Sequence, residues 1–468
     1  MKIISMIRGW MHMLFRSKAK EIFEVENVIT PEMEGMINAC SDIYAGKPDW
    51  VDPDEYIKTI NFAKSICSEV ARLTTLAIGI KLDGSSRAKY LQERIDKEYF
   101  NIRNWVEFAC AYGTVVLKPS IQGIDLILPG KFMVTDQQDG EITGMVFIEQ
   151  KEQDKDYYTR LEYHRFVDER LYAVSNRCYK GKSLNDLNKA VPIDATPWNG
   201  MLEDAFIQNI DKPLYGVLRT PQANNIDPYS AMGIPIFAEA IEELKDLDIA
   251  YSRNAKEIKD SKRILLLDGD RMLPTGTPIK EQMHTFNQNR IQMGLPDMVK
   301  NVFGDGVNTF YQEINPTLQT ETRIMGINAL LSQIGYKCGF SNGYFVFNES
   351  SGIQTATGVE AEQQRTIQFI KDVRDKLEVC LDGVIYALNV FADLYNLAPY
   401  GPYEVVYDFG DITYNREEDR ARWYGYASQN KVPFWYYLVK FEGMTEEEAK
   451  AMVEEARPKQ PTLFGMEE

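Results

Sequence analysis

Residues Gly233 to Asp268 read GIPIFAEAIEELKDLDIAYSRNAKEIKDSKRILLLD, and this stretch decides how the rest of the chain is interpreted. Its apolar residues recur at steps of three and four, which is the spacing of one face of a helix. Pro235 suits the first helical turn, where its missing N–H costs nothing. The stretch therefore predicts a long helix with a narrow apolar face, followed by a short strand that ends at Asp268. The apolar face consists of Phe237, Ala240, Ile241, Leu244, Leu247, Tyr251, Ala255 and Ile258.

Charged residues follow a fixed order along the same stretch. Acidic residues, Asp248 among them, occupy the front half of the helix, and basic residues occupy the back half. This order complements the helix dipole at both ends. An ordinary surface helix would show the same pattern, so this stretch alone does not single out a helix that packs against partners. The basic residues are Lys256, Lys259, Lys262 and Arg263.

Length and composition narrow the class of protein. The chain has 468 residues, which suggests about three domains, and its 44% hydrophobic residues can supply sizeable cores. The net charge is −17, from 52 Lys and Arg against 69 Asp and Glu. Because phosphate affinity comes from Lys and Arg, we do not expect tight nucleic-acid binding over the general surface. The composition does not exclude local basic patches.

Cysteine and histidine usage argues against disulfides and zinc. None of the six cysteines forms a C-x-x-C pair and most lie among apolar residues, which predicts buried, reduced thiols. The three histidines are far apart in the sequence and match no zinc spacing. No apolar run reaches the roughly 18 residues that a membrane helix needs.

The N-terminal segment from Met1 to Glu21 has an apolar face bordered by basic residues. It is not a secretory signal, because Arg8 and His12 interrupt the apolar part and no small-residue cleavage site follows. We expect this arm to dock on the rest of the protein or on a neighbouring subunit. Contact with a membrane surface is the alternative.

The region that follows is predicted to be α+β, with helices first and a meander of strands after them. Gly113 should end the last of the helices, and residues 180–211 have the composition of loops. The expected helices cover residues 30–46, 61–76, 86–100 and 102–112, and the expected strands cover residues 114–120, 124–130, 141–150, 157–167 and 170–179.

A segment rich in Pro and Gly, residues 268–317, lies between two long helices. It is expected to contain one helix at residues 280–293 and short strands near Val302 and Phe310. The second long helix begins near Leu318.

The remaining chain starts with a loop of small and polar residues at 341–358. Thr357 and Glu360 form a capping-box pattern that opens a third, longer helix, which ends before Pro399. YEVVYDFG then predicts a strand, and two or three short helices follow, one of them capped at Thr445. The last residues are expected to be disordered.

No catalytic signature occurs in the sequence. A P-loop, a G-x-G-x-x-G turn, a G-x-S-x-G elbow and an H-E-x-x-H helix are all absent. Asp268, Asp270 and Asp305 lack the spacing of a calcium loop, and turn chemistry explains Asp268-Gly269-Asp270 better. We therefore expect no enzyme, no metal site and no cofactor. A metal-dependent enzyme that acts on nucleic acid and a membrane-surface scaffold are the alternative interpretations.

The order of these parts resembles a portal protein of tailed bacteriophages, of the branch found in phages of Gram-positive hosts. The resemblance spans nearly the whole chain. Its most specific parts are YGVLRTPQANNIDPYSAMGIPIFAEAIEELKDLD, KRILLLD, TATGVEAEQQRTIQFIKDV and VVYDFGDITYNREEDRARWYGYASQNKVPFWYYL.

The resemblance implies a portal-type fold with the following parts. They are an N-terminal arm (1–22), an α+β wing (23–233), a first stem helix (234–262), a clip (263–317), a second stem helix (318–340), a tunnel loop (341–357), a long helix with a wing strand (358–415) and a helical crown with its tail (416–468).

The resemblance also implies a function. Portal proteins form a ring of about twelve copies at one capsid vertex, through which double-stranded DNA is packaged and ejected. The implied partners are the terminase large subunit, a head-tail adaptor, and the major capsid and scaffolding proteins, with no membrane contact. The implied location is the virion, after assembly in the host cytoplasm. A net negative surface would let DNA pass without sticking.

Three sets of residues follow as candidate sites. The basic residues of the first stem helix, Lys256, Lys259, Lys262 and Arg263, are expected to touch DNA or neighbouring subunits, or else only to complement the helix dipole. The tunnel loop would place Asn342, Tyr344, Phe345, Asn348, Ser350 and Ser351 in the channel. The clip would dock the terminase and then the adaptor, through Asp268, Asp270, Arg271 and Arg290.

Overall fold

The computed structural model describes two compact units, residues 1–409 and 410–468, each with gaps. The described residues are 15–187, 189–260, 264–268, 298–302, 311–314, 319–346, 356–410, 416–429, 431–442 and 444–455. Both helices and sheets occur in the first unit, so the predicted α+β class is confirmed.

Four helices follow the N-terminal helical segment of the first unit, close to where the sequence predicts them. They are α2 (Pro31–Tyr44), α3 (Phe62–Thr74), α4 (Ser86–Lys97) and α5 (Tyr99–Tyr112). The Thr30 hydroxyl accepts a hydrogen bond from the Met33 N–H at 3.4 Å and so caps α2. Gly113, with φ of 79°, ends α5 as predicted.

Two antiparallel sheets follow the helices. The larger sheet has the order β4-β5-β6-β7-β8, and β9 also pairs with β7. The smaller one has the order β10-β2-β3. The strands are β2 (Thr114–Pro119), β3 (Ile124–Ile127), β4 (Phe132–Gln138), β5 (Glu141–Gln153), β6 (Asp156–Asp168), β7 (Leu171–Gly181), β8 (Lys189–Val191), β9 (Asp204–Gln208) and β10 (Gly216–Arg219).

Two of these strands correct the prediction that residues 180–211 are loops. β8 has only three residues, and alternate residues of β9 are exposed. Each strand offers at most three apolar residues in a row, and both are held by pairing with β7.

The described part of the N-terminal arm packs on the larger sheet. Residues 15–23 are helical, and Phe15 and Ala19 are buried among residues of β4, β5 and β6 that include Met133, Val146 and Leu161. The expectation that the arm docks on the rest of the protein is confirmed for these residues.

The first long helix is shorter than predicted. α6 covers Ile241–Asp260 and follows a single 3₁₀ turn, η2 (Ala238–Ala240). The predicted start at residue 234 is wrong, because the backbone there is bonded to the preceding α+β region, residues 23–233, which we call the wing. The Ile236 N–H donates to the carbonyl of Cys110 at 3.0 Å, and the Ile234 carbonyl accepts from the Thr220 hydroxyl at 2.7 Å. Pro235 therefore lies before the helix.

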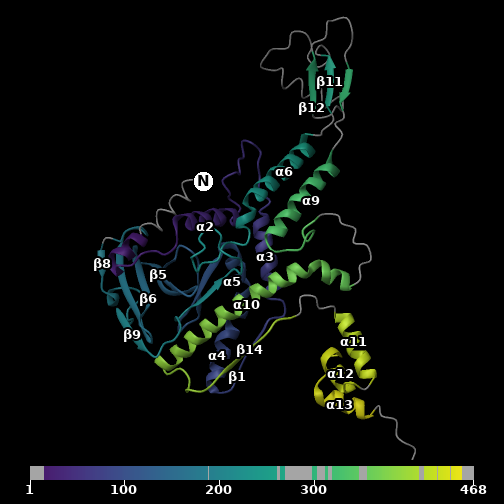
Figure 1. Ribbon diagram of the computed structural model, residues 1–468. Helices are drawn as coiled ribbons and strands as arrows, with labels where there is room; N and C mark the ends of the chain where they lie inside the picture. The colour runs from purple at the N-terminus through teal and green to yellow at the C-terminus, as the bar shows by residue number, and fades with distance from the viewer. Residues whose placement is uncertain are drawn as a thin grey trace, which may run out of the picture. The chain divides into compact units, whose positions relative to one another are not determined.

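A three-stranded sheet and a second helix follow α6 along the chain. β11 (Ile264–Asp268) pairs in parallel with β12 (Met298–Val302) and antiparallel with β13 (Tyr311–Ile314). The short strands predicted near residues 302 and 310 agree with β12 and β13. The helix predicted at residues 280–293 lies outside the described residues. The second long helix is α9 (Thr320–Lys337), which lies beside α6 (Figure 1).

The longest helix of the described residues is α10 (Ala356–Leu394), labelled in Figure 1, and it packs on β10 at very close range. A Cβ atom at Gly216 would lie 2.4 Å from the carbonyl oxygen of Cys380, and one at Gly383 would lie 3.2 Å from that of Tyr215. The strand and the helix therefore touch backbone to backbone. Because α10 begins at Ala356, Thr357 lies inside the helix rather than before it, which corrects the predicted capping box.

A two-stranded ribbon closes the first unit. The predicted strand is present as β14 (Glu404–Asp408), and it pairs antiparallel with β1 (Gly79–Asp83). β1 had no predicted counterpart in the sequence.

The second unit contains three short helices in its described part, as predicted. They are α11 (Arg416–Ser428), α12 (Phe434–Glu442) and α13 (Glu446–Glu455). Thr445 and Glu448 form a reciprocal capping box at α13, since each backbone N–H donates to the side chain of the other, at 3.1 and 3.4 Å. This cap confirms the prediction at Thr445.

Arg87 of α4 ties that helix to the end of α10. Its guanidinium is buried and donates to the Asn389 carbonyl and side chain at 3.0 and 2.8 Å, to Asp393 at 2.6 Å, and to the carbonyls of Ala398 and Pro399 at 2.8 and 3.1 Å. We expect Arg87→Met to lower the free energy of unfolding of the first unit by about 3 kcal/mol, because these acceptors lose a charged donor. Denaturant unfolding followed by tryptophan fluorescence measures the change.

Arg72→Met provides the matched control. Arg72 pairs with Glu69 one helical turn away at the surface, where such pairs contribute less than about 1 kcal/mol. Equal losses in the two variants would contradict the assignment of Arg87 as an anchor.

Candidate functional site

The candidate site is the antiparallel pair of α6 and α9 with the segment that packs along it. At one end of the pair, the Glu243 carboxylate accepts from Lys337 at 2.6 Å and from Gln333 at 3.1 Å. At the other end, Glu257 forms an ion pair with Arg323. Since polar contacts hold both ends, the two helices are fixed in register with each other.

Residues 47–61, between α2 and α3, lie along α6, and we call this segment the strap. Asp248 on α6 is buried and accepts two hydrogen bonds from it, from the Trp50 indole N–H at 2.9 Å and from the Ile60 backbone N–H at 3.0 Å. A buried carboxylate needs such donors, because an unpaired charge would be costly away from water. Asp248 therefore holds the strap on α6 near both of its ends.

Two further contacts continue along the helix. Ser252 accepts from the Lys58 N–H at 2.8 Å and donates to the Lys58 carbonyl at 3.2 Å. The Lys259 ammonium lies 4.5 Å from the centre of the Tyr56 ring and donates to its hydroxyl. From residue 248 to residue 259, α6 rises about 16 Å, so the strap follows three turns of the helix.

These contacts change the interpretation of the charged residues on α6. Asp248 is a buried acceptor and not a solvent-exposed charge that complements the dipole. Lys259 contacts the strap, and both Lys256 and Lys259 are exposed. Lys262 and Arg263 lie outside the described residues. The sequence could not show this, because the partners of both corrected residues lie about two hundred positions away.

The predicted apolar face of α6 is only partly buried. Leu244 and Leu247 lie in the core, but Tyr251 is 43% exposed and Ile258 is 53% exposed. On α9, Met325 is 72% exposed. The half of the helix pair farther from the wing core therefore presents apolar side chains to solvent.

The start of the predicted tunnel loop is packed against the wing. The centre of the Phe345 ring lies 4.7 Å from the centre of the Phe340 ring and 5.2 Å from that of the Phe62 ring. The Tyr344 hydroxyl donates a hydrogen bond to Glu69 of α3. Tyr344 and Phe345 are half-buried by these contacts, and their place in a channel stays a prediction. Asn342 is exposed.

Several predicted site residues lie outside the described residues. They are Asn348, Ser350 and Ser351 of the tunnel loop, and Asp270, Arg271 and Arg290 of the clip. Asp268 is the last residue of β11.

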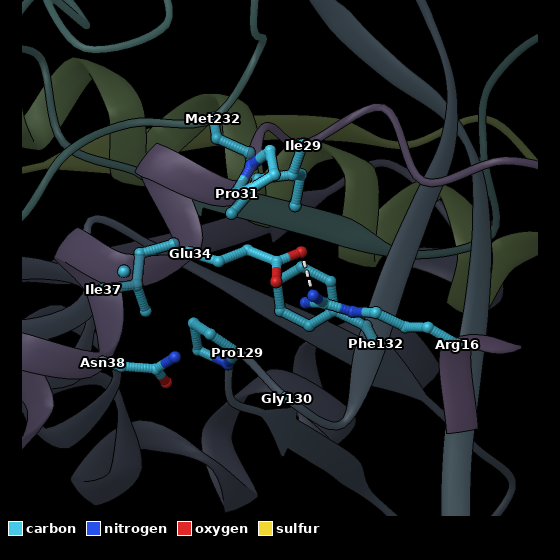
Figure 2. Close-up of a pocket in the computed structure, with 11 residues that line it drawn as sticks. Arg16, Ile29, Pro31, Glu34, Ile37, Asn38, Pro129, Gly130, Phe132 and Met232 are labelled. Carbon is cyan, nitrogen blue, oxygen red and sulfur yellow. Dashed lines mark ion pairs between the residues drawn. The ribbon is translucent and has the colours of Figure 1, made fainter. Parts of the chain in front are cut away.

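A cavity of about 250 Å³ lies between the N-terminal helix, α2 and β4. Figure 2 shows Arg16 and Glu34 pointing toward one another inside it, where they form an ion pair. Glu34 also accepts from the Asn27 amide at 2.6 Å. Much of the remaining wall is apolar, including Ile37 and Phe132. Because its two charged groups neutralise each other, the cavity does not favour an ionic ligand.

A buried network of titratable groups lies between the two wing sheets. Glu162 of β6 accepts from Lys118 of β2 at 2.5 Å and pairs with Arg160 at 2.9 Å, and its second oxygen lies 3.0 Å from His164 Nε2. The other ring nitrogen of His164 lies 3.1 Å from the Tyr172 hydroxyl. This network joins the sheets and is buried, so its role is structural.

The pKa values follow from these contacts. Burial alone would raise the pKa of Glu162, but the charges of Lys118 and Arg160 outweigh it and hold this pKa well below its usual value. Burial lowers the pKa of His164, and the hydrogen bond to Glu162 only partly offsets that. Three residues at alternate positions of β6 carry this network, a spacing visible in the sequence.

The six cysteines are buried and none forms a disulfide, as predicted. Burial raises the pKa of every one of these thiols, that of Cys40 to about 12. A raised pKa suppresses the reactive thiolate, so these side chains act as apolar packing groups.

Comparison with known proteins does not identify a family. No protein-family model matches the chain, and no curated protein matches it. Within the described residues, no cluster of three or more His, Cys, Asp or Glu could hold a metal ion. The helices of that part include none long and apolar enough to cross a membrane.

The strap makes a prediction about Asp248. Asp248→Ala should release the strap, because Trp50 and the Ile60 N–H lose their acceptor, at a cost of about 2 kcal/mol. We expect the Trp50 fluorescence to shift toward that of a solvated indole. Limited proteolysis should cleave within residues 52–58 at a higher rate.

Asp246→Ala is the control on the same helix, since Asp246 is exposed. It should leave both the fluorescence and the cleavage rate unchanged. A strap that stays protected in Asp248→Ala would refute the tethering role.

The buried network predicts a pH dependence. The folded chain holds His164 neutral and Glu162 ionised more strongly than the unfolded chain, so it binds fewer protons as pH falls. Stability should therefore fall below the usual histidine pKa of 6.5 and again below the usual glutamate value of 4.5. Unfolding of His164→Asn between about pH 7.5 and pH 5.5 should show a smaller loss than the wild type. An unchanged slope would mean that His164 does not contribute.

Proposed function

We propose that the chain is a subunit of a homo-oligomeric ring that conducts double-stranded DNA, the portal of a tailed bacteriophage. The observation that carries the proposal is the α6–α9 pair, whose distal half exposes Tyr251, Ile258 and Met325. Apolar side chains gathered on one helix pair favour burial against another chain. A head-to-tail contact of this kind closes into a ring when the rotation between copies permits.

Chain order supports the same proposal. The small sheet of β11, β12 and β13 is inserted between α6 and α9, while the α+β wing precedes α6 and α10 follows α9. In a portal these parts would be the clip, the stem, the wing and the long helix. The separate helical unit at residues 410–468 would then be the crown.

Charge also favours a conduit over a tight DNA-binding protein. With a net charge of −17, few phosphates would be neutralised by the general surface, and DNA could slide past it. Lys259 contacts Tyr56 and is exposed, as is Lys256. Under this proposal, Lys256 and Lys259 are the described stem residues that would meet DNA or a neighbour.

The partners and the location belong to the same proposal. The terminase large subunit and the head-tail adaptor would dock in turn on the clip, and the capsid and scaffolding proteins would surround the ring at one vertex of the virion. A membrane-surface scaffold receives less support, because Phe15 and Ala19 of the N-terminal helix are buried against the wing sheet.

The proposal predicts how the purified chain assembles. Native mass measurement and electron microscopy should find rings with a central hole, containing about twelve copies. Tyr251→Glu combined with Ile258→Glu should shift the population to single chains, since two charges would enter an apolar interface. The secondary structure of the single chain should be retained.

Tyr400→Glu serves as the control, because Tyr400 is 87% exposed and lies outside the helix pair. This variant should assemble like the wild type. A wild-type chain that stays monomeric at every concentration would exclude the ring.

A further inference from the structure

The ribbon of β1 and β14 has one protected edge and one open edge. On the outer side of β1, the Gln92 side chain of α4 accepts from the Leu82 N–H at 2.7 Å and donates to the Ile80 carbonyl at 3.0 Å. A side-chain amide thus replaces the neighbouring strand that these backbone groups would otherwise need. The edge of β1 is closed to any further strand.

The register shows which groups of β14 point away from β1. Because Ile80 and Leu82 direct their backbone groups outward to Gln92, Lys81 directs its own toward Val406, its partner in the ribbon. Backbone groups alternate sides along a strand, so those of Val405 and Tyr407 point outward on the far edge. No group among the described residues pairs with them.

The surroundings of this edge are acidic. Glu404 and Asp408 are exposed on β14, and the Tyr407 hydroxyl donates to Asp382 of α10 at 2.7 Å. Asp375 and Glu378 continue that stripe of α10 at helical spacing. No ion pair to these five carboxylates is formed by a Lys or Arg among the described residues, although Lys81 lies across the ribbon from Val406.

Burial and the neighbouring carboxylates change the pKa of Glu378. Burial, and then the charges of Asp375 and Asp382, raise the pKa of Glu378. An incoming cation stabilises the ionised form of a carboxyl group, such as Glu378, that lies among other negative charges.

We propose that the open edge of β14 is a docking site for an extended segment of another protein that carries Lys or Arg at alternate positions. The segment would extend the ribbon by hydrogen bonding to the backbone of Val405 and Tyr407, as in strand addition to other sheet edges. Side chains opposite Tyr407 would stand within about 5.5 Å of its Cβ, close enough for a long basic side chain to reach Asp382 and Glu378. The inference goes beyond the proposed ring and does not depend on it.

The test uses the full chain and a fluorescent synthetic peptide of about nine residues that alternates lysine and threonine. Fluorescence anisotropy should show saturable binding that weakens as salt is added. A peptide with glutamate in place of lysine, and a lysine peptide N-methylated at alternate backbone amides, should each bind at least about tenfold more weakly.

Val405→Pro is the decisive variant. Its missing N–H would face outward, where an edge strand tolerates proline, so β1 pairing is kept while the docking donor is lost. Binding should weaken at least about tenfold, whereas Val405→Thr should bind like the wild type. Unchanged thermal unfolding of Val405→Pro shows that the ribbon is intact.

A second variant tests the charge. Asp375→Asn combined with Glu378→Gln should weaken the lysine peptide and leave the glutamate peptide unaffected. Equal binding of both peptides to the wild type would overturn the basic character of the partner.

Absence of binding to the wild type would overturn the proposal. If Val405→Pro instead changed the native mass of the assembly, the edge would belong to a second copy of this chain, and docking of a different protein would be excluded.

Discussion

The crossing of α10 over β10 is the contact on which the first unit depends. Gly216 and Gly383 bring a strand and a helix to backbone contact, and any side chain at Gly216 would collide with the carbonyl of Cys380. Because α10 is held this closely, its other residues can serve as fixed anchors. Arg374 donates to the last carbonyls of α3 at 3.1 Å, and Thr366 accepts from the Ser341 N–H at 2.8 Å. These hydrogen bonds hold α3 and the segment after α9 in fixed positions against α10.

Buried charges provide the ties between segments that are distant in sequence. Arg87 joins α4 to the end of α10, Asp248 joins α6 to the strap, and Glu162 joins the two wing sheets. A charge removed from water is tolerated only where partners surround it, so each of these residues specifies one arrangement of its segments. The apolar core gives the unit most of its stability but is less selective about such pairings. Buried ion pairs and hydrogen bonds of this kind fix the arrangement of the wing segments in a chain whose net charge is strongly negative.

Local signals account for what could be predicted from the sequence. The end of α5 at Gly113 and the cap at Thr445 depend on neighbouring residues only, and both were predictable. The start of the first long helix was not, since Ile234 bonds to Thr220 instead of the next helical turn. For the candidate site, the apolar periodicity identified the helix α6, but nothing near Lys259 in sequence pointed to Tyr56. Contacts across about two hundred residues leave no periodic trace, and the strap was therefore unpredictable.

The buried thiols have a practical consequence for spectroscopy. Since all six native cysteines are buried and hard to ionise, maleimide dyes should not react with them under native conditions. A single cysteine introduced at a chosen surface position would then carry the only fluorophore, with no need to replace the native residues. A second introduced cysteine would carry a second dye, and energy transfer would report the distance between the two positions while all native cysteines stay in place.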